Sequence, residues 1–201
     1  MRKEPPLVMQ ALWAVVGLLL TMGGTFLEAF FTSPPWNWTG QGVKAVSLGV
    51  TYQIGAVLLT GCMAGARAAA AAQIAYVVLG LTWLPVFAQG GGLQYLFNPS
   101  FGYILGFVAG AWVCGAIAHR LACRLEYLAF SSLFGLVTIH LYGLVYLFLF
   151  YFVTNWRSLN TNHFPLGEYV LRYSVYPLAG QLALVCAVAV LAFVLRKLMF
   201  Y

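Results

Sequence analysis

Few side chains in this 201-residue sequence could carry out acid–base or metal chemistry. Only four acidic residues occur, and none of them pair as in a catalytic dyad. The three histidines are far apart, no HExxH zinc pattern is present, and no GxxxxGK[ST] loop exists to bind nucleotide phosphates. We therefore predict that the chain is not an enzyme and has no metal and no cofactor. The residues concerned are Glu4, Glu28, Glu126, Glu168, His119, His140 and His163.

The segment 76–106 has the composition of a small-molecule binding site. It begins and ends as apolar helix, but Pro85, the triplet Gly90-Gly91-Gly92 and the pair Asn98-Pro99 interrupt it. Aromatic side chains are mixed there with a few neutral polar ones, as in pockets that enclose a ligand. Adjacent glycines also let backbone groups approach a ligand closely. The pattern favours a binding loop, and a structural cap over a helix bundle is the alternative.

The composition predicts that membrane-spanning helices position this segment. Hydrophobic residues make up 63% of the chain and charged residues 7%, too few to cover a water-facing surface. Six apolar stretches are long enough to cross the bilayer, and the alternation of a membrane barrel is absent. We predict an all-α polytopic membrane protein, one domain over 1–201, with the glycine-rich loop between helices 3 and 4. The predicted helices lie near 7–31, 45–64, 67–85, 103–119, 127–153 and 174–198.

Basic residues predict the orientation of these helices. The net charge of +6 is scattered between apolar runs and forms no patch for nucleic acid. With a cytoplasmic N-terminus, seven Lys and Arg residues lie inside and three outside, so the positive-inside rule places both termini in the cytoplasm. The segment 85–99 is then expected on the outer side of the cell membrane. The inner set is Arg2, Lys3, Arg67, Arg120, Arg124, Arg196 and Lys197, and the outer set is Lys44, Arg157 and Arg172.

Small residues recur at every fourth position on two predicted helices. Such faces allow close helix approach, and internal bundle packing is their general interpretation. The series on the first predicted helix is also a candidate surface for a partner subunit. The two series are Gly102, Gly106 and Gly110, and Gly17, Thr21, Thr25 and Ala29.

Isolated polar groups within the apolar runs are given structural interpretations. Four cysteines occur without a CxxC pair, so we expect them to pack between helices rather than to form disulfides or bind zinc. His140 lies deep in the fifth predicted helix, where we expect a hydrogen bond to a backbone carbonyl, and contact with a ligand is the alternative.

The interrupted segment resembles the BioY family, the biotin-binding S components of energy-coupling factor (ECF) transporters. The resemblance rests on YxxxGxxxxPVFAxGGG followed by LxxPxxGYxxGF, which run here from Tyr76 to Phe107. Upstream, Thr51-Tyr52-Gln53 before an apolar helix is similar to the family's TxQ segment. The similarity extends over residues 50–118.

The resemblance implies a six-helix subunit that captures biotin from outside and works with a transmembrane T component and two ATPase subunits. Aromatic residues would contact the fused ring, and neutral polar groups would pair with the ureido group. Small residues of the first helix would contact the T component, which points to Gly17, Thr21, Thr25 and Ala29. The candidate ligand-binding residues are Gln53, Tyr76, Phe87, Gln89, Gly90, Gly91, Tyr95, Asn98, Tyr103 and Gln181.

The last predicted helix departs from the family's pattern PFxxGDxxK, whose acid and lysine resemble ligand-contacting groups. This chain has Gln181 at the acid position and Leu184 at the lysine position. Gln181 can both donate and accept hydrogen bonds, so it can still bind a ureido ring. Arg172 and Arg157 are the candidate cations for the biotin carboxylate. The alternatives to biotin uptake are an S component for another vitamin and a membrane assembly protein with no solute.

Overall fold

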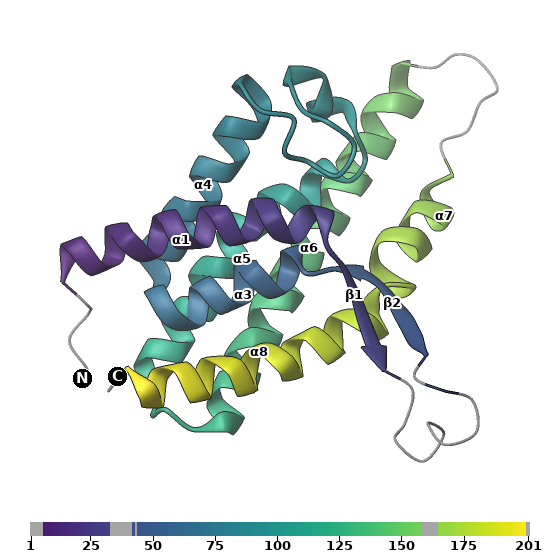
Figure 1. The fold of residues 1–201 in the computed structure, drawn as a ribbon. Coiled ribbons are helices and arrows are strands. Elements are labelled where there is room, and N and C mark those ends of the chain that lie inside the picture. The colour runs from purple at the N-terminus through teal and green to yellow at the C-terminus, as the bar shows by residue number, and fades with distance from the viewer. Residues whose placement is uncertain (1–5, 33–41, 43, 158–164, 200–201) are drawn as a thin grey trace.

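The structure, a computed structural model, describes residues 6–32, 42, 44–157 and 165–199, with the side chains of 155–157 left out. These residues form a helix bundle with a short hairpin at one end (Figure 1). The helices are α1 (Leu7–Phe26), α3 (Gln53–Ala64), α4 (Ala66–Thr82), α5 (Phe101–Arg120), α6 (Leu125–Arg157), α7 (Leu166–Val170) and α8 (Leu178–Leu198). The strands are β1 (Glu28–Thr32) and β2 (Ala45–Thr51), and two shorter helical turns are the 3-10 helix η2 (Leu93–Phe97) and the π-helical turn η3 (Leu171–Val175).

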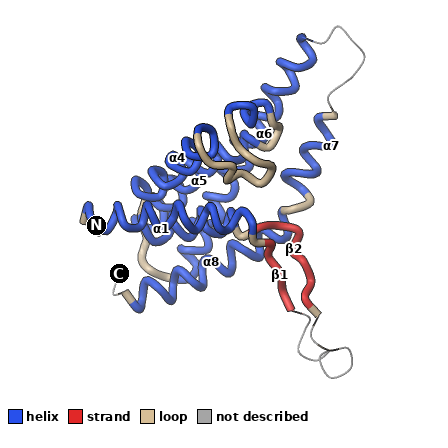
Figure 2. Tube along the Cα trace, turned by 45° about the horizontal axis from the view of Figure 1, so that its top comes forward, coloured by secondary structure: helices blue, strands red, loops and turns tan. Residues whose placement is uncertain are grey.

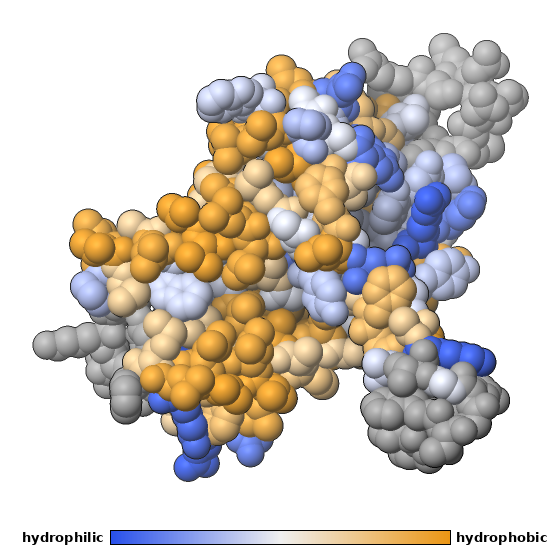
Figure 3. Space-filling model, viewed as in Figure 1, coloured by the Kyte–Doolittle hydropathy of each residue, from blue (hydrophilic) through white to orange (hydrophobic). Residues whose placement is uncertain are grey.

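Four stretches are long and apolar enough to cross a membrane, and they lie in α1, α5, α6 and the run from α7 to α8. The apolar helices α3 and α4 are shorter. The chain is thus a mostly helical, multi-pass membrane protein with six main helices, as predicted. Figure 3 shows hydrophobic residues spread over α1 and α8, the faces suited to lipid. Exposed leucines such as Leu12, Leu19 and Leu191 contribute to this apolar exterior.

The all-α prediction is wrong in one region, because the stretches 7–31 and 45–64 each contain a strand. β1 and β2 pair antiparallel, with Phe30 opposite Ser47 and Thr32 opposite Ala45. The helix α1 ends where Leu27 turns to extended backbone. Lipid cannot satisfy the open edges of a two-stranded sheet, so the hairpin belongs at an aqueous end of the bundle. Figure 2 shows the hairpin projecting from the bundle, in red.

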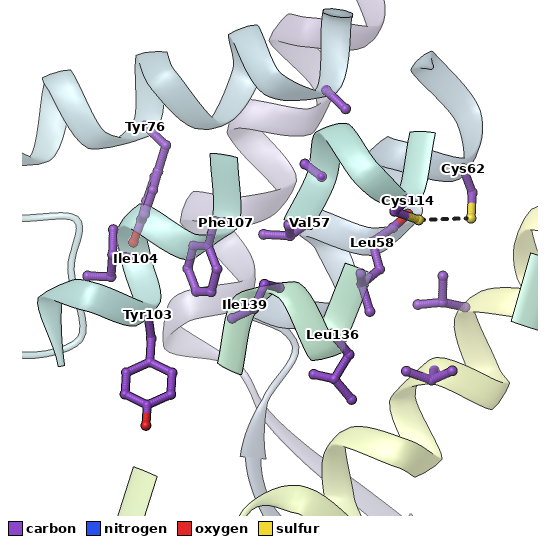
Figure 4. Close-up of a cluster of buried hydrophobic side chains, with 14 of the residues drawn as sticks. Val57, Leu58, Cys62, Tyr76, Tyr103, Ile104, Phe107, Cys114, Leu136 and Ile139 are labelled. Carbon is purple, nitrogen blue, oxygen red and sulfur yellow. Dashed lines mark hydrogen bonds between the residues drawn. The ribbon is translucent and has the colours of Figure 1, made fainter. Parts of the chain in front are cut away.

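The centre of the bundle is the contact of α5 with α6. A Cβ atom at Gly106 would lie 2.8 Å from the carbonyl oxygen of Ile139, and one at Gly110 would lie 2.5 Å from the Ile139 side chain. Only glycine permits this approach, which confirms internal packing for that series. Cys62 and Cys114 lie in the same core with their Sγ atoms 3.7 Å apart (Figure 4), so these two cysteines pack between helices as expected.

The series on α1 also packs inside the chain, which corrects its assignment as a partner surface. A Cβ atom at Gly17 would overlap Thr60, and Thr21 Oγ1 accepts a 3.0 Å hydrogen bond from Gln73 on α4. Thr21 and Thr25 are 0% and 4% exposed. Ala29 lies on β1 rather than on the helix and is fully buried. All four residues are therefore covered by the chain itself.

Candidate ligand-binding site

A hollow of about 270 Å³ lies at the end of the bundle where α3, α5 and α8 begin. The loop 83–100 and the strand β2 contribute to its walls, and the two chain termini lie away from the hairpin end (Figure 1). It is lined by Gly49, Val50, Thr51, Gln53, Ile54, Ala88, Tyr95, Ser100, Tyr103, Ile104, Phe107, Arg172, Tyr173, Pro177 and Gln181.

Four of the predicted ligand-binding residues meet in this hollow. Gln53 reaches it from α3, Tyr103 from α5, Gln181 from α8 and Tyr95 from η2. Burial raises the pKa of Tyr95 above the ordinary value, so its hydroxyl stays protonated at neutral pH. These segments are far apart in the sequence, and the fold brings their polar groups into one hollow with apolar and aromatic walls.

Two further predicted residues, Tyr76 and Phe87, lie outside the lining and support it. The Tyr76 hydroxyl donates to the Val86 carbonyl at 2.9 Å and accepts from Gln53 Nε2 at 2.8 Å. Phe87 is 1% exposed and packs edge-on against Tyr76, with ring centroids 5.4 Å apart. Tyr76 therefore holds Gln53 in position from the buried side.

The remaining predicted residues shape the loop instead of lining the hollow. Phe87 and Gly90 exchange backbone hydrogen bonds of 2.9 and 3.0 Å in a tight turn that leaves Gly90 at φ +112°, which favours glycine. A Cβ atom at Gly91 would lie 2.7 Å from the Gly80 carbonyl oxygen. Asn98 Nδ2 donates to Gln89 Oε1 at 2.7 Å. Gly90 thus permits the tight turn, and Gly91 permits close packing of the loop onto α4.

A chain of hydrogen bonds reaches from the hollow to α6. His140 Nε2 lies 2.6 Å from Gln181 Oε1, and His140 Nδ1 lies 3.2 Å from Ser174 Oγ. Ser174 Oγ in turn lies 2.6 Å from the Tyr103 hydroxyl. The expectation that His140 bonds a backbone carbonyl is wrong, because its two ring nitrogens hydrogen-bond the side chains of Ser174 on η3 and Gln181 on α8. No group of three or more His, Cys, Asp or Glu among the described residues is placed to hold a metal.

The sequence profile of the BioY family matches residues 9–200. The chain belongs to the BioY family. It is 29% identical over 192 residues to an uncharacterized 21.2 kDa protein of Cyanophora paradoxa, a match that covers 94% of this chain and 95% of the relative.

Relatives with named functions match over a shorter range. A probable biotin transporter BioY of Lysinibacillus sphaericus is 37% identical over 99 residues, which is 49% of this chain and 50% of the relative. The biotin transporter BioY of Thermotoga maritima is 39% identical over 94 residues, or 46% of this chain and 55% of the relative. These two matches therefore cover about half the length of each relative.

The fold is shared with a solved structure. The crystal structure at 2.1 Å of the S-component for biotin from an ECF-type ABC transporter aligns with a TM-score of 0.64 at 19% sequence identity. The alignment covers 95% of this chain and 90% of that chain. At this identity the similarity establishes the S-component fold.

The structure shows where the residue at the lysine position of the BioY pattern and the two candidate cations lie. Leu184 is 3% exposed and packs with Ala29 and Val50 beneath the hairpin, outside the hollow. Arg172, on η3, is the one basic residue among those that line the hollow. Arg157, the other candidate, has a side chain outside the described residues.

Several lining residues were not predicted from the sequence. Strand β2 provides backbone and small side chains through Gly49 and Thr51, and η3 provides Tyr173. Ser174 does not line the hollow but hydrogen-bonds Tyr103 in its wall, and its place between Tyr173 and Tyr176 in the sequence is a weak signal. The structure itself points to Ser174, because the residue lies on the π-helical turn η3 and such turns are frequent at functional sites.

Proposed function

We propose that this member of the BioY family is the biotin-binding S component of an ECF transporter. It would capture biotin from the outer side and deliver it together with a transmembrane T component and two ATPase subunits. Residues 1–201 would act as a single membrane domain with both termini in the cytoplasm. Two of the relatives reported above are named as biotin transporters, one of them as a probable one, which agrees with a binding subunit that carries out no catalysis.

The composition of the hollow carries this proposal. Its walls are mostly apolar and aromatic, and its polar groups are two amides, a few hydroxyls and one guanidinium. The fused ring of biotin needs apolar contact, its ureido group needs hydrogen-bond partners, and its carboxylate needs a cation. Gln53 and Gln181 supply the amides, and Arg172 supplies the cation. At about 270 Å³ the hollow suits a small ligand, near the lower end of ligand pockets at ~300–1,000 Å³.

A binding panel tests the proposal. We expect detergent-purified protein to bind biotin by isothermal titration calorimetry and not to bind thiamine, riboflavin or pantothenate under the same conditions. Mass spectrometry of the purified protein should also identify biotin carried through purification. Binding of another vitamin in preference to biotin would contradict the assignment of biotin as the ligand. Absence of binding to every vitamin tested would contradict a role in vitamin uptake.

Cysteine labelling tests the proposed orientation. Leu93 is 67% exposed on η2, so Leu93→Cys should react with a membrane-impermeant maleimide added to intact cells. Cys123, between α5 and α6, should react only after the cells are opened. The reverse pattern of labelling would place the hollow on the cytoplasmic side and exclude capture from outside.

A further inference from the structure

His140 is a histidine in the transmembrane helix α6 that hydrogen-bonds the side chain at the family's acid position. It does not line the hollow itself. Its ring also packs edge-on against Tyr103, with centroids 5.8 Å apart. It therefore connects α6 with Gln181 of α8 and with Tyr103 of α5, both of which do line the hollow.

The direction of the His140–Gln181 bond follows from the atoms involved. An amide oxygen can only accept, so the hydrogen of the 2.6 Å bond to Gln181 Oε1 belongs to His140 Nε2. This holds whether or not Nδ1 is also protonated. In the neutral ring, Nδ1 accepts from the Ser174 hydroxyl at 3.2 Å, and Ser174 Oγ accepts from Tyr103 at 2.6 Å.

The consequence is that the oxygen of Gln181 is occupied within the protein. Its amide nitrogen has no hydrogen-bond partner among the described residues, so its two N–H donors are available to the hollow. Gln53 has the complementary arrangement. Its Nε2 donates to Tyr76 at 2.8 Å, and its Oε1 has no partner among the described residues.

We infer that His140 is a positioning residue which fixes Gln181 with its amide nitrogen toward the ligand, so that the pocket reads a neutral cyclic urea with a donor from Gln181 and an acceptor from Gln53. The inference rests on the proposed function. It explains how the site works without the family's acid: the ligand carbonyl receives N–H groups from Gln181, and a ligand N–H donates to Gln53. A ligand with a donor in place of that carbonyl leaves the Gln181 N–H groups without an acceptor.

Three variants at position 140 test the inference. His140→Leu removes the donor, so the Gln181 amide can rotate, and we expect biotin affinity to fall about tenfold. His140→Gln restores an N–H near the Nε2 position and should recover most of the affinity. Thr138→Val is the matched control on the same helix, since the Thr138 hydroxyl bonds only the Phe134 carbonyl of α6. Equal affinities of wild type and a folded His140→Leu would overturn the inference.

Ligand discrimination separates positioning from a merely structural role. The guanidine analogue of biotin is protonated at neutral pH, so it presents only N–H donors in place of the ureido C=O, where the pocket also offers a donor. We expect the wild type to prefer biotin strongly over this analogue, and His140→Leu to lose several-fold of that preference. His140→Gln should retain it. An unchanged preference in His140→Leu would contradict the inference while leaving biotin binding intact.

A spectroscopic test does not depend on the ligand or on a destabilised variant. With ¹⁵N-labelled histidine, the His140 signal, identified by its absence in His140→Gln, should show hydrogen on Nε2 in the ligand-free protein. Hydrogen on Nδ1 with a bare Nε2 would overturn the inference whatever the ligand. If this test succeeds and biotin still does not bind, the proposed function fails on its own account.

Discussion

The two ends of the helix bundle hold hollows of similar size and different chemistry. The one at the beginning of α3, α5 and α8 has a volume of about 270 Å³ and presents amides, aromatic rings and a single arginine. The one at the other end has a volume of about 300 Å³ and is lined by the basic residues Arg67, His119 and Arg120, with Gln10 and Trp112. Volume alone therefore does not distinguish a ligand site from a gap between helix ends.

The chemical difference between the two hollows agrees with the proposed orientation and the proposed site. Arg67 and Arg120 belong to the basic set that the positive-inside rule assigns to the cytoplasm, so the proposed orientation would account for their position at this end. At the other end, a single cation lines the hollow together with two amides, one held by the buried Tyr76 and the other by the partly buried His140. Fixed amides cost little reorganisation when a ligand arrives, which is what selective binding requires. The predictions below test this contrast.

The largest expected effect is at Gln181. Gln181→Leu removes the amide that faces the ligand and leaves the ureido oxygen of bound biotin without that donor, at a cost of ~1–3 kcal/mol. We expect biotin affinity to fall about 100-fold by calorimetry. Gln94→Leu is the control, because Gln94 does not line the hollow. Equal losses in the two variants would show that the amide at 181 has no special role.

The next effect concerns the close packing of the loop. A Cβ atom at Gly80 would lie 2.2 Å from the Phe87 ring, whereas one at Gly23 would meet nothing within 4 Å. Gly80→Ala should therefore destabilise the protein by roughly 1–3 kcal/mol, measured as a lower Tm in detergent, and should weaken biotin binding by displacing the loop. Gly23→Ala should change neither. A Gly80→Ala protein with unchanged Tm would contradict the described contact of the loop with α4.

A comparison of arginines tests the contrast between the two ends directly. Arg172→Gln should weaken biotin binding about tenfold by removing the cation for the carboxylate, and should leave binding of biotin methyl ester unchanged. Arg120→Gln removes the same charge from the other hollow and should not affect either ligand. If Arg120→Gln had the larger effect, the hollows would have been assigned to the wrong roles.

The smallest expected effect is at Tyr76, which holds Gln53. Tyr76→Phe deletes the acceptor of Gln53 Nε2 and the donor to the Val86 carbonyl, so we expect about a fivefold loss of biotin affinity. Tyr142→Phe, at an exposed position of α6, is the matched control and should bind as the wild type does. Unchanged biotin affinity in Tyr76→Phe would show that the hydrogen bond from Gln53 to Tyr76 is not needed to position Gln53.

The sequence predicted the helical part of the fold well because hydropathy reports length and apolarity. It failed at Glu28–Thr32 and Ala45–Thr51, where apolar residues continue but the backbone becomes extended. Hydropathy cannot distinguish an apolar strand from the end of an apolar helix. It also failed for Thr21 and Thr25, since a small residue at helical spacing indicates close packing but not which neighbour packs there.

The candidate site was predictable as far as the residues that resemble the BioY family. Gln53, Tyr95, Tyr103 and Gln181 were found in this way, and the structure brings them to one hollow. The partners of His140 could not be predicted, because Ser174 and Gln181 lie 34 and 41 residues further along the chain and meet it only in the folded bundle.

The most direct test of the central claim is a crystal structure of the protein with biotin bound. We predict biotin in the hollow at the beginning of α3, α5 and α8, with its ureido oxygen next to the amide nitrogen of Gln181 and its carboxylate next to Arg172. Biotin bound in the hollow formed by Arg67 and Arg120, or a hollow at Gln181 that stays empty at saturating biotin, would contradict the account.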